Sequence, residues 1–452
     1  MTAQERNRML LHEPINKVIP RLAVPSIISM LISAIYNMAD TFFVSQIGTS
    51  ASAAVGVTFS IMTIVQAIAF TIGMGSGTNV SQALGAGDEK RARRFVSVGV
   101  ITAFAVGVVI AIAGLSCIEP LVYFLGATET IAPYAIDYAT YIFYGTPFIM
   151  ASFAMNNMLR FEGLAMYGMI GITAGGILNM ILDPILIFGL GLGTAGAAIA
   201  TAFSQFVSFA ILLFMSNTRP DAISIRFKHF RPTLSMYGRI LYNGVPSLGR
   251  QGIASVSNIL LNTTAAAYGD AAIAAMSIVG RFVMFINSSV IGFGQGFQPV
   301  CGFSYGAGAY TRVRKAFAYC VKVTTCILIV LGLGSMLLSS QIIAVFRRDD
   351  LEVIRIGTLA LRLQLCTIPL WGFIVMSNMF TQSIGYGVRA TLISVSRQGL
   401  FLIPALLVLP PLCGLLGIQM AQPVSDLLSF ALSFVVARGI LRQLAGMEDK
   451  AA

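Results

Sequence analysis

The sequence predicts an all-α polytopic membrane protein in which twelve transmembrane helices form two six-helix bundles, related by a parallel internal repeat. Three observations support this prediction. Of the 452 residues, 56% are hydrophobic and only 10% are charged. The second half repeats the first with an offset of 221 residues: "VPS" at 24–26 returns at 245–247, and "GAGDEKRARR" at 85–94 returns as "GAGAYTRVRK" at 306–315. Each copy also contains six apolar stretches that are long enough to cross a bilayer.

The expected spans follow one another along both copies. They cover 20–47, 52–84, 95–117, 133–160, 163–188 and 193–215, and then 239–268, 273–300, 316–338, 354–382, 388–408 and 414–437. Because six is an even number, both copies enter the membrane in the same direction, and an axis along the membrane normal should relate them. The predicted domains are an amino-terminal lobe at 1–217, a cytoplasmic linker at 218–238 and a carboxy-terminal lobe at 239–452.

The distribution of Lys and Arg predicts the orientation. Basic residues gather in the loops after the second, sixth and eighth spans and are absent from most loops on the other side. The exception is the 339–353 loop, where Arg347 and Arg348 lie among acidic residues. We therefore expect a multi-pass protein of the cytoplasmic (plasma) membrane with both termini in the cytoplasm. Its basic cytoplasmic loops account for the net charge of +11 without a nucleic-acid partner.

Several classes of enzyme are poorly supported. The only histidines, His12 and His229, fall in predicted cytoplasmic segments, which excludes a histidine-based catalytic or metal site within the membrane. No Lys follows a Gly, so the chain has no P-loop and no nucleotide drive. The stretch "GLGTAG" at 191–196 matches GxGxxG, but it joins two membrane helices and does not follow a strand. We expect neither an enzyme nor a cofactor.

Ionisable residues inside the spans indicate a functional site, because each costs roughly 2.5–3.5 kcal/mol on insertion scales. In the first half these are Asp40, Asp137 and Asp183, and no Lys or Arg lies in the body of any span there. Asp183 follows Asn179 by four residues, so the two side chains share one helix face. Two further pairs of polar residues are also four residues apart: Thr201 with Gln205, and Tyr36 with Asp40.

These groups would form an oxygen-rich pocket if the first, fifth and sixth spans meet. Such oxygens suit a hard cation, by analogy with Ca²⁺ and Mg²⁺, and the carboxylates alone can carry protons. Pro184 cannot donate to the carbonyl of Met180, which leaves a kinked helix with a spare oxygen beside Asp183. The alternative is that the two acids only hydrogen-bond to neighbouring helices. The sequence leaves both the role and the ion, Na⁺ and/or H⁺, open.

At these residues the chain resembles the multidrug and toxic-compound extrusion (MATE) family of cation-coupled exporters. The resemblance covers nearly the whole chain, and its most specific part is "DPILIFG" at 183–189, supported by "LRFEG" at 159–163 and "VPSLGRQG" at 245–252. In the branch of the family with an acid in the first helix, the matching positions form an amino-lobe cation site. The resemblance places that site, which would hold Na⁺ in a sodium-coupled transporter, at Asp40, Asn179, Asp183 and Thr201.

The carboxy-terminal half departs from this acidic pattern. Its predicted spans contain one acid, Asp426, and four arginines, which are Arg250, Arg281, Arg362 and Arg397. These arginines either pair with Asp426 and exposed helix carbonyls, or they meet an anionic or zwitterionic substrate. Glu162, near the cytoplasmic end of the fourth span, either gates entry or is a solvated charge at a helix end.

The resemblance implies antiport, in which Na⁺ or H⁺ entering down its gradient drives a drug-like or metabolic compound outward by alternating access. The alternative within transport is a flippase or exporter for anionic or lipid-linked substrates, which the basic carboxyl lobe would serve. A membrane scaffold without transport would make Asp40 and Asp183 dispensable. The expected partners are a small-molecule substrate and membrane lipids, and we expect a monomer that binds neither nucleic acid nor nucleotide.

Overall fold

The computed structural model describes residues 3–346 and 350–451, and within them it contains helices and no strand. The amino-terminal bundle consists of α2 (Ile15–Ser45), α3 (Thr49–Gly85), α4 (Glu89–Ser116), α6 (Ala132–Phe161), α7 (Ala165–Pro184) and α8 (Gly193–Thr218). The carboxy-terminal bundle consists of α9 (Leu234–Ala266), α10 (Asp270–Gly306), α11 (Tyr310–Leu337), α13 (Leu351–Ser383), the pair α14 (Gly387–Val395) and α15 (Leu402–Cys413), and α16 (Leu415–Ala451). The prediction of an all-α protein with twelve spans in two bundles is confirmed.

The hydropathy of the helices agrees with this count. Ten of the spans, with α7 and the α14–α15 pair each taken as one, are long and apolar enough to cross a membrane. The other two are α6 and α9, which contain more polar side chains, such as Asn156 and Asn157 in α6 and Asn243 and Arg250 in α9. Arg347 and Arg348, the exception in the charge distribution, lie outside the described residues.

Three short helices were not expected from the sequence. They are α1 (Ala3–His12), α5 (Ile118–Phe124) and α12 (Ser339–Phe346). Side chains cap the amino-terminal ends of two long helices. Asp88 accepts from the amide of Arg91 at 3.0 Å before α4, and Thr233 accepts from the amide of Met236 at 3.3 Å before α9.

A π-helical segment interrupts one span in each bundle. In the amino-terminal bundle it covers Ile185–Gly189 and directly follows Pro184, which lacks the amide proton that a regular helix would use there. In the carboxy-terminal bundle it covers Ser396–Leu400. Each segment adjoins or contains an ionisable residue, Asp183 in the first case and Arg397 in the second. Such interruptions are frequent at functional sites because they turn side chains out of the regular helical register.

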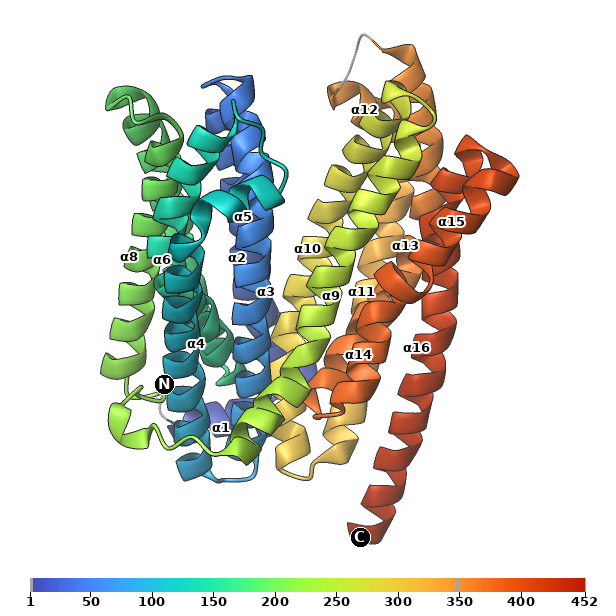
Figure 1. Cartoon of the computed structure of the whole chain (residues 1–452). Helices are drawn as coiled ribbons and strands as arrows, with labels where there is room; N and C mark the ends of the chain where they lie inside the picture. Colours follow the sequence, from blue (N-terminus) through green and yellow to red (C-terminus); the bar gives the residue numbers. More distant parts are fainter. Residues whose placement is uncertain (1–2, 347–349, 452) are drawn as a thin grey trace.

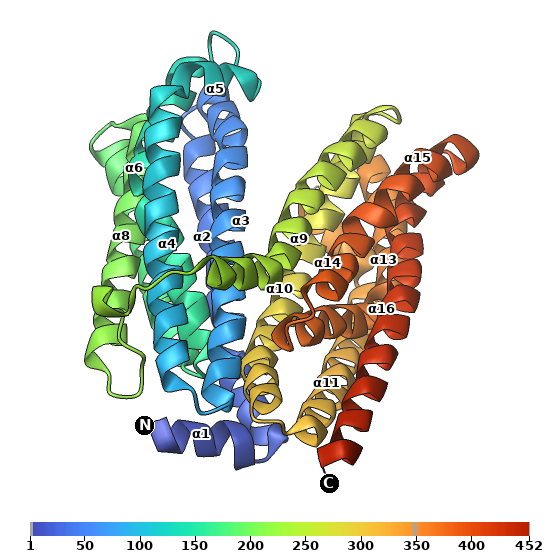
Figure 2. The ribbon, with the colours of Figure 1, turned by 60° about the horizontal axis from the view of Figure 1, so that its bottom comes forward.

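The two bundles lie side by side, and both chain termini are at the same end of the molecule (Figure 1). At this end the bundles are close together, with α3 packed against α9 and α10, and α10 packed against α2. They diverge toward the end that carries α5 and α12, as both views show (Figures 1 and 2). The short helix α1 lies at the end with both termini, where the bundles are in contact and which we call the closed end. There Arg312 of α11 donates to the carbonyls of Leu10 at 2.9 Å and Glu13 at 2.7 Å.

Candidate functional site

The α7 and α8 helices bring three of the predicted site residues together. Asn179 and Asp183 lie one turn apart on the buried face of α7, and the amide nitrogen of Asn179 donates to Asp183 Oδ1 at 3.3 Å. The same nitrogen is 3.2 Å from Thr201 Oγ1 on α8, which packs against α7. Asp183 is fully buried, and Asn179 and Thr201 are 2% and 4% exposed. The i, i+4 spacing thus places the amide between the carboxylate and the hydroxyl.

The α2 helix supplies the second carboxylate. Asp40 lines the same small cavity as Thr201, and Tyr36 lies one turn earlier on α2 with its side chain buried. The hydroxyl of Tyr138, on α6, is 3.4 Å from Asp40 Oδ2 and was not among the predicted site residues. A small cavity of about 20 Å³ lies beside Asp40 and Thr201 and is lined also by Tyr36 and Tyr138. That volume accommodates one occupant of about the size of a water molecule.

Among the described residues, several buried oxygen atoms on α2, α7 and α8 have no hydrogen-bond partner. They include Asp40 Oδ1, Asn179 Oδ1, Asp183 Oδ2, Ser204 Oγ and Gln205 Oε1. Within the described residues no Lys or Arg forms an ion pair with Asp40 or Asp183. Buried oxygens without donors are costly unless something else satisfies them. The cluster therefore has the free oxygen atoms that would coordinate a cation or share protons between the carboxylates.

Asp137 does not belong to this cluster. It lies on α6 one residue before Tyr138, but unlike Tyr138 it is exposed. The two remaining acids of the amino-terminal spans, Asp40 and Asp183, are therefore the pair that the fold brings together. Gln205 lies one turn after Thr201 on α8 and is 7% exposed.

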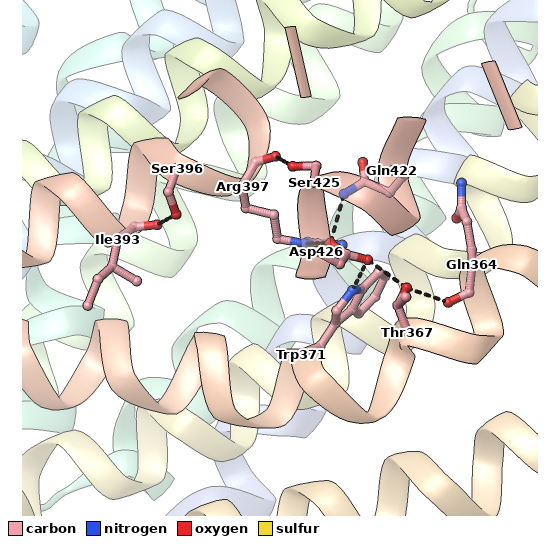
Figure 3. A network of polar contacts seen from close by, with 9 residues as sticks. All are labelled: Gln364, Thr367, Trp371, Ile393, Ser396, Arg397, Gln422, Ser425 and Asp426. Atoms are coloured by element: carbon pink, nitrogen blue, oxygen red, sulfur yellow. Dashed lines mark hydrogen bonds and ion pairs between the residues drawn. The ribbon is translucent and has the colours of Figure 1, made fainter. Parts of the chain in front are cut away.

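The carboxy-terminal bundle has a different polar centre around Asp426 on α16 (Figure 3). Asp426 Oδ1 accepts from Arg397 Nε at 2.7 Å and from Gln422 Nε2 at 2.9 Å. Oδ2 accepts from Trp371 Nε1 at 2.7 Å and from Thr367 Oγ1 at 3.0 Å. The guanidinium carbon of Arg397 is 3.9 Å from the centroid of the Trp371 ring. Both carboxylate oxygens are thus saturated, in contrast to those of the amino-terminal cluster.

The other predicted arginines are dispersed. Arg362 Nε donates to Ser339 Oγ at 2.8 Å, next to the start of α12, and Arg281 on α10 is exposed. Arg250 on α9 is partly buried and forms no ion pair with an acid among the described residues. Arg160, the last residue of the fourth predicted span, lies in the last turn of α6 and is only 3% exposed.

Glu162 follows α6 directly and is buried rather than solvated, with 1% of its side chain exposed. Its Oε2 accepts from the backbone amide of Ile223 in the linker at 2.9 Å. Burial raises the pKa of Glu162 from 4.5 to about 7, although the nearby charge of Arg6 lowers it. Arg6 of α1 donates to the carbonyl of Asp221 at 2.6 Å, so α1, the end of α6 and the linker form one contact region.

Comparison with known proteins gives consistent matches over both repeats. The sequence profile of the MatE family matches residues 25–185 and 246–407. The chain is 26% identical over 437 residues to the multidrug export protein MepA of Staphylococcus haemolyticus, covering 96% of each chain. It is 28% identical over 410 residues to the protein of the same name in Staphylococcus aureus, covering 90% of this chain and 89% of that one.

Solved structures agree over nearly the full length. One is the outward-facing conformation of a multidrug resistance MATE family transporter of the MOP superfamily, with a TM-score of 0.91, 27% identity, and coverage of 97% of this chain and 98% of that one. Another is a MOP superfamily transporter from Pyrococcus furiosus, for which a reverse polarity of the binding pocket suggests a different function. Its TM-score is 0.90 at 26% identity, with coverage of 97% of this chain and 98% of that one.

Proposed function

The chain belongs to the MatE family of multidrug efflux transporters, and on this premise we propose that it is a cation-coupled antiporter that exports drug-like or metabolic small molecules across the cytoplasmic membrane. Na⁺ or H⁺ enters down its gradient and drives the substrate outward. The two lobes, 1–217 and 239–452, move against each other about the 218–238 linker. The protein acts as a monomer with both termini in the cytoplasm and needs no cofactor besides the coupling ion.

One observation carries the proposal: the unpartnered oxygens of Asp40, Asn179, Asp183 and Gln205, which lie in the amino-terminal lobe. Two carboxylates in one buried cluster without a base repel when both are ionised. A Na⁺ ion or a proton removes that repulsion, so the lobe has two states that differ in charge and in the packing of α2, α7 and α8. The saturated carboxylate of Asp426 has no corresponding need, which favours the amino-terminal lobe as the coupling lobe.

The arrangement of the bundles supports alternating access. They are in contact at the end with both termini and diverge at the other end (Figure 1), as expected for a state closed to the cytoplasm. An ion shifts the balance between this state and its opposite only through a difference in affinity for the two. The position of the ion site within one lobe, near α2, lets ion binding act on the α2–α10 contact between the lobes.

A second candidate function is export of anionic or lipid-linked substrates. It is favoured by Arg250, a partly buried guanidinium without an acidic partner in the described part of the chain. It is also favoured by likeness to the Pyrococcus furiosus transporter described as having a pocket of reverse polarity. In this case the ion site keeps its role and only the charge of the cargo changes.

Proteoliposomes test the proposal. A fluorescent organic cation and an anionic dye are each loaded, and efflux is followed under a Na⁺ gradient at equal pH and then under a pH gradient without Na⁺. Antiport predicts that at least one gradient accelerates efflux of at least one dye and that the dye in turn drives ion movement the other way. Efflux that ignores both gradients would rule out coupled transport, and the dye that moves decides between the two cargo classes.

A further inference from the structure

A groove lies between α11 and α16 at the closed end of the carboxy-terminal bundle, where the two helices contact each other (Figure 2). Glu448 of α16 bridges the helices there, accepting from Thr311 Oγ1 at 2.7 Å and from Arg314 Nη1 at 3.1 Å. The groove has a volume of about 600 Å³ and a mostly apolar surface. Its lining consists of Thr311, Arg314, Lys315, Phe317, Ala318, Val321, Lys322 and Leu441. One cavity thus combines an apolar wall with three cationic side chains.

The exposed residues of α11 in this groove form one stripe along the helix. Lys315, Ala318 and Lys322 are exposed and follow one another at intervals of three and four residues, so their side chains share one face. Phe317 and Cys320, which lie between them in the sequence, are buried. Because α11 is long and apolar enough to cross the membrane, the exposed stripe faces lipid.

Lys322 is the unusual member of this stripe. It lies seven residues after Lys315, or about 10 Å farther into the membrane at the rise of an α-helix. Lys322 is exposed, and among the described residues no acid pairs with it or with Lys315. A charge on a lipid-facing surface is costly, and a long side chain lowers the cost by extending toward the headgroups. Helix side chains lean toward the amino-terminal end of their helix, which for α11 is the closed end. This lean favours an ammonium group directed along the groove toward Lys315.

The start of α11 also lacks the acids that balance the equivalent helix of the first repeat. In α4, Asp88 caps the helix and Glu89 pairs with Arg93 at 3.2 Å. At the 221-residue offset the chain has Ala309 and Tyr310 instead, and α11 has neither a side-chain cap nor an acid in its first turn. The cations at the start of α11 therefore add to the positive end of the helix dipole, and an anion beside them would be stabilised.

The deep cation belongs to the second repeat alone. At the 221-residue offset, Lys322 corresponds to Ile101 of α4, whereas Lys315 corresponds to Arg94. In the groove, the pair with Glu448 compensates Arg314. Lys315 and Lys322 remain as two positive charges on one lipid-facing face, at the level of the headgroups and below it.

We infer that this groove binds an anionic phospholipid of the leaflet at the closed end. Its phosphate group would lie between Lys315 and Lys322, and an acyl chain would lie along the wall of Ala318, Val321 and Leu441. Lysine ammonium groups bind phosphate as point charges, and basic pockets between membrane helices bind anionic headgroups. The site depends neither on cation coupling nor on the identity of the transported substrate.

Tryptophan quenching in proteoliposomes tests the site. The native Trp371 is 1% exposed, so lipids with brominated acyl chains should quench mainly an introduced tryptophan. Ala318→Trp places the reporter in the groove, and Ala210→Trp is the matched control, because Ala210 is exposed on α8 eight residues before that helix ends at the same end. Each variant is reconstituted with brominated phosphatidylglycerol in plain phosphatidylcholine, and then with the bromine on the phosphatidylcholine. We expect the ratio of phosphatidylglycerol to phosphatidylcholine at Ala318→Trp to exceed the bulk ratio at least about fivefold, and the ratio at Ala210→Trp to stay near it.

Second substitutions in the Ala318→Trp protein test the two lysines. Lys322→Ile, which restores the residue of the first repeat, and Lys315→Gln should each lower the preference about fivefold. Lys90→Gln, which removes an exposed lysine of α4 at the same end, should leave the preference unchanged. Equal lipid ratios at Ala318→Trp and Ala210→Trp, or an undiminished preference in Lys322→Ile, would overturn the inference. Failure of coupled transport is distinguishable, since Asp40→Asn should keep the lipid preference.

Discussion

Gly85 of α3 and Gly306 of α10 occupy equivalent positions in the two repeats, and each lies on the backbone of the other's helix. A Cβ atom at Gly85 would overlap the carbonyl oxygen of Phe303, and one at Gly306 would overlap the carbonyl oxygen of Gln82. Both Gly85 and Gly306, and Gln82 and Phe303, are separated by the 221-residue offset of the repeat. The contact between the lobes is therefore symmetric at this point and admits no side chain at either glycine.

This contact gives the first prediction. Gly85→Ala or Gly306→Ala should destabilise the closed end by about 1–3 kcal/mol, because the added methyl group meets backbone that can move only if the helices separate. Spin labels at the exposed Lys90 and Lys315, in a background without native cysteines, should show longer distances between the lobes.

Each helix provides its own control for that measurement. Gly56 of α3 and Gly280 of α10 have open space where a Cβ would lie, so Gly56→Ala and Gly280→Ala should leave the distances unchanged. Identical distance distributions in the parent and in Gly85→Ala would contradict the idea that this contact holds the closed end together.

The second prediction concerns orientation. In the same cysteine-free background, a Cys at the exposed linker residue Lys228 should react with a membrane-impermeant maleimide only after the cells are opened. A Cys at Thr130, in the exposed loop before α6 at the other end of the molecule, should react in intact cells. The opposite pattern would invert the orientation that the Lys and Arg distribution predicts.

The third prediction uses the pKa of Glu162, which burial raises from 4.5 to about 7. Between these values the folded protein binds the proton and the unfolded chain releases it, so the free energy of unfolding falls as pH rises through this window, by on the order of 3 kcal/mol. Glu162→Gln keeps an acceptor for the amide of Ile223 but cannot ionise. Its unfolding midpoint should change less between pH 5 and pH 8 than that of the parent. An equal change in both proteins would exclude Glu162 as the source.

The fourth prediction uses Trp371, the single tryptophan of the chain, as a reporter of the Asp426 centre. Its indole nitrogen donates to Asp426 and its ring stacks on Arg397. Asp426→Asn should leave Arg397 without its acidic partner, which costs about 3–5 kcal/mol for a buried pair. Arg397→Lys keeps the positive charge but loses the stack on the Trp371 ring. Acrylamide should quench the fluorescence more strongly than in the parent, in which Trp371 is 1% exposed.

The same two variants separate the two interpretations of Arg397 when their protein levels and transport are measured. If Arg397 serves only the fold, both variants should have lower protein levels and transport all substrates equally poorly. Selective loss of anionic cargo at normal protein level would instead give Arg397 a role in binding.

The spans could be predicted from the sequence because long apolar stretches and the 221-residue repeat are properties of the chain itself. The helices α1, α5 and α12 could not, since they have only 10, 7 and 8 residues, too few for a membrane-spanning pattern.

Only part of the candidate cation site could be predicted from the sequence. The proximity of Asn179 to Asp183 follows from their spacing on one helix, whereas the approach of Tyr138 to Asp40 depends on how α6 packs in the bundle. In the sequence Arg160 is an ordinary charge at the end of a helix. Its burial depends on packing, which brings its guanidinium against Met74 of α3 and Asn157 of α6. A single sequence carries no signal for such a contact.

The central claim is that Asp40 and Asp183 couple export to the cation gradient. The most direct measurement is gradient-driven efflux from proteoliposomes containing the parent, Asp40→Asn, Asp183→Asn or Asp137→Asn. Asn keeps the size of the side chain but removes the charge that a cation or proton neutralises, and Asp137, an exposed acid of the same lobe, is the matched control. Coupled efflux should fall at least tenfold for Asp40→Asn and Asp183→Asn and stay near the parent rate for Asp137→Asn. Efflux at the parent rate in both Asp40→Asn and Asp183→Asn would contradict the claim.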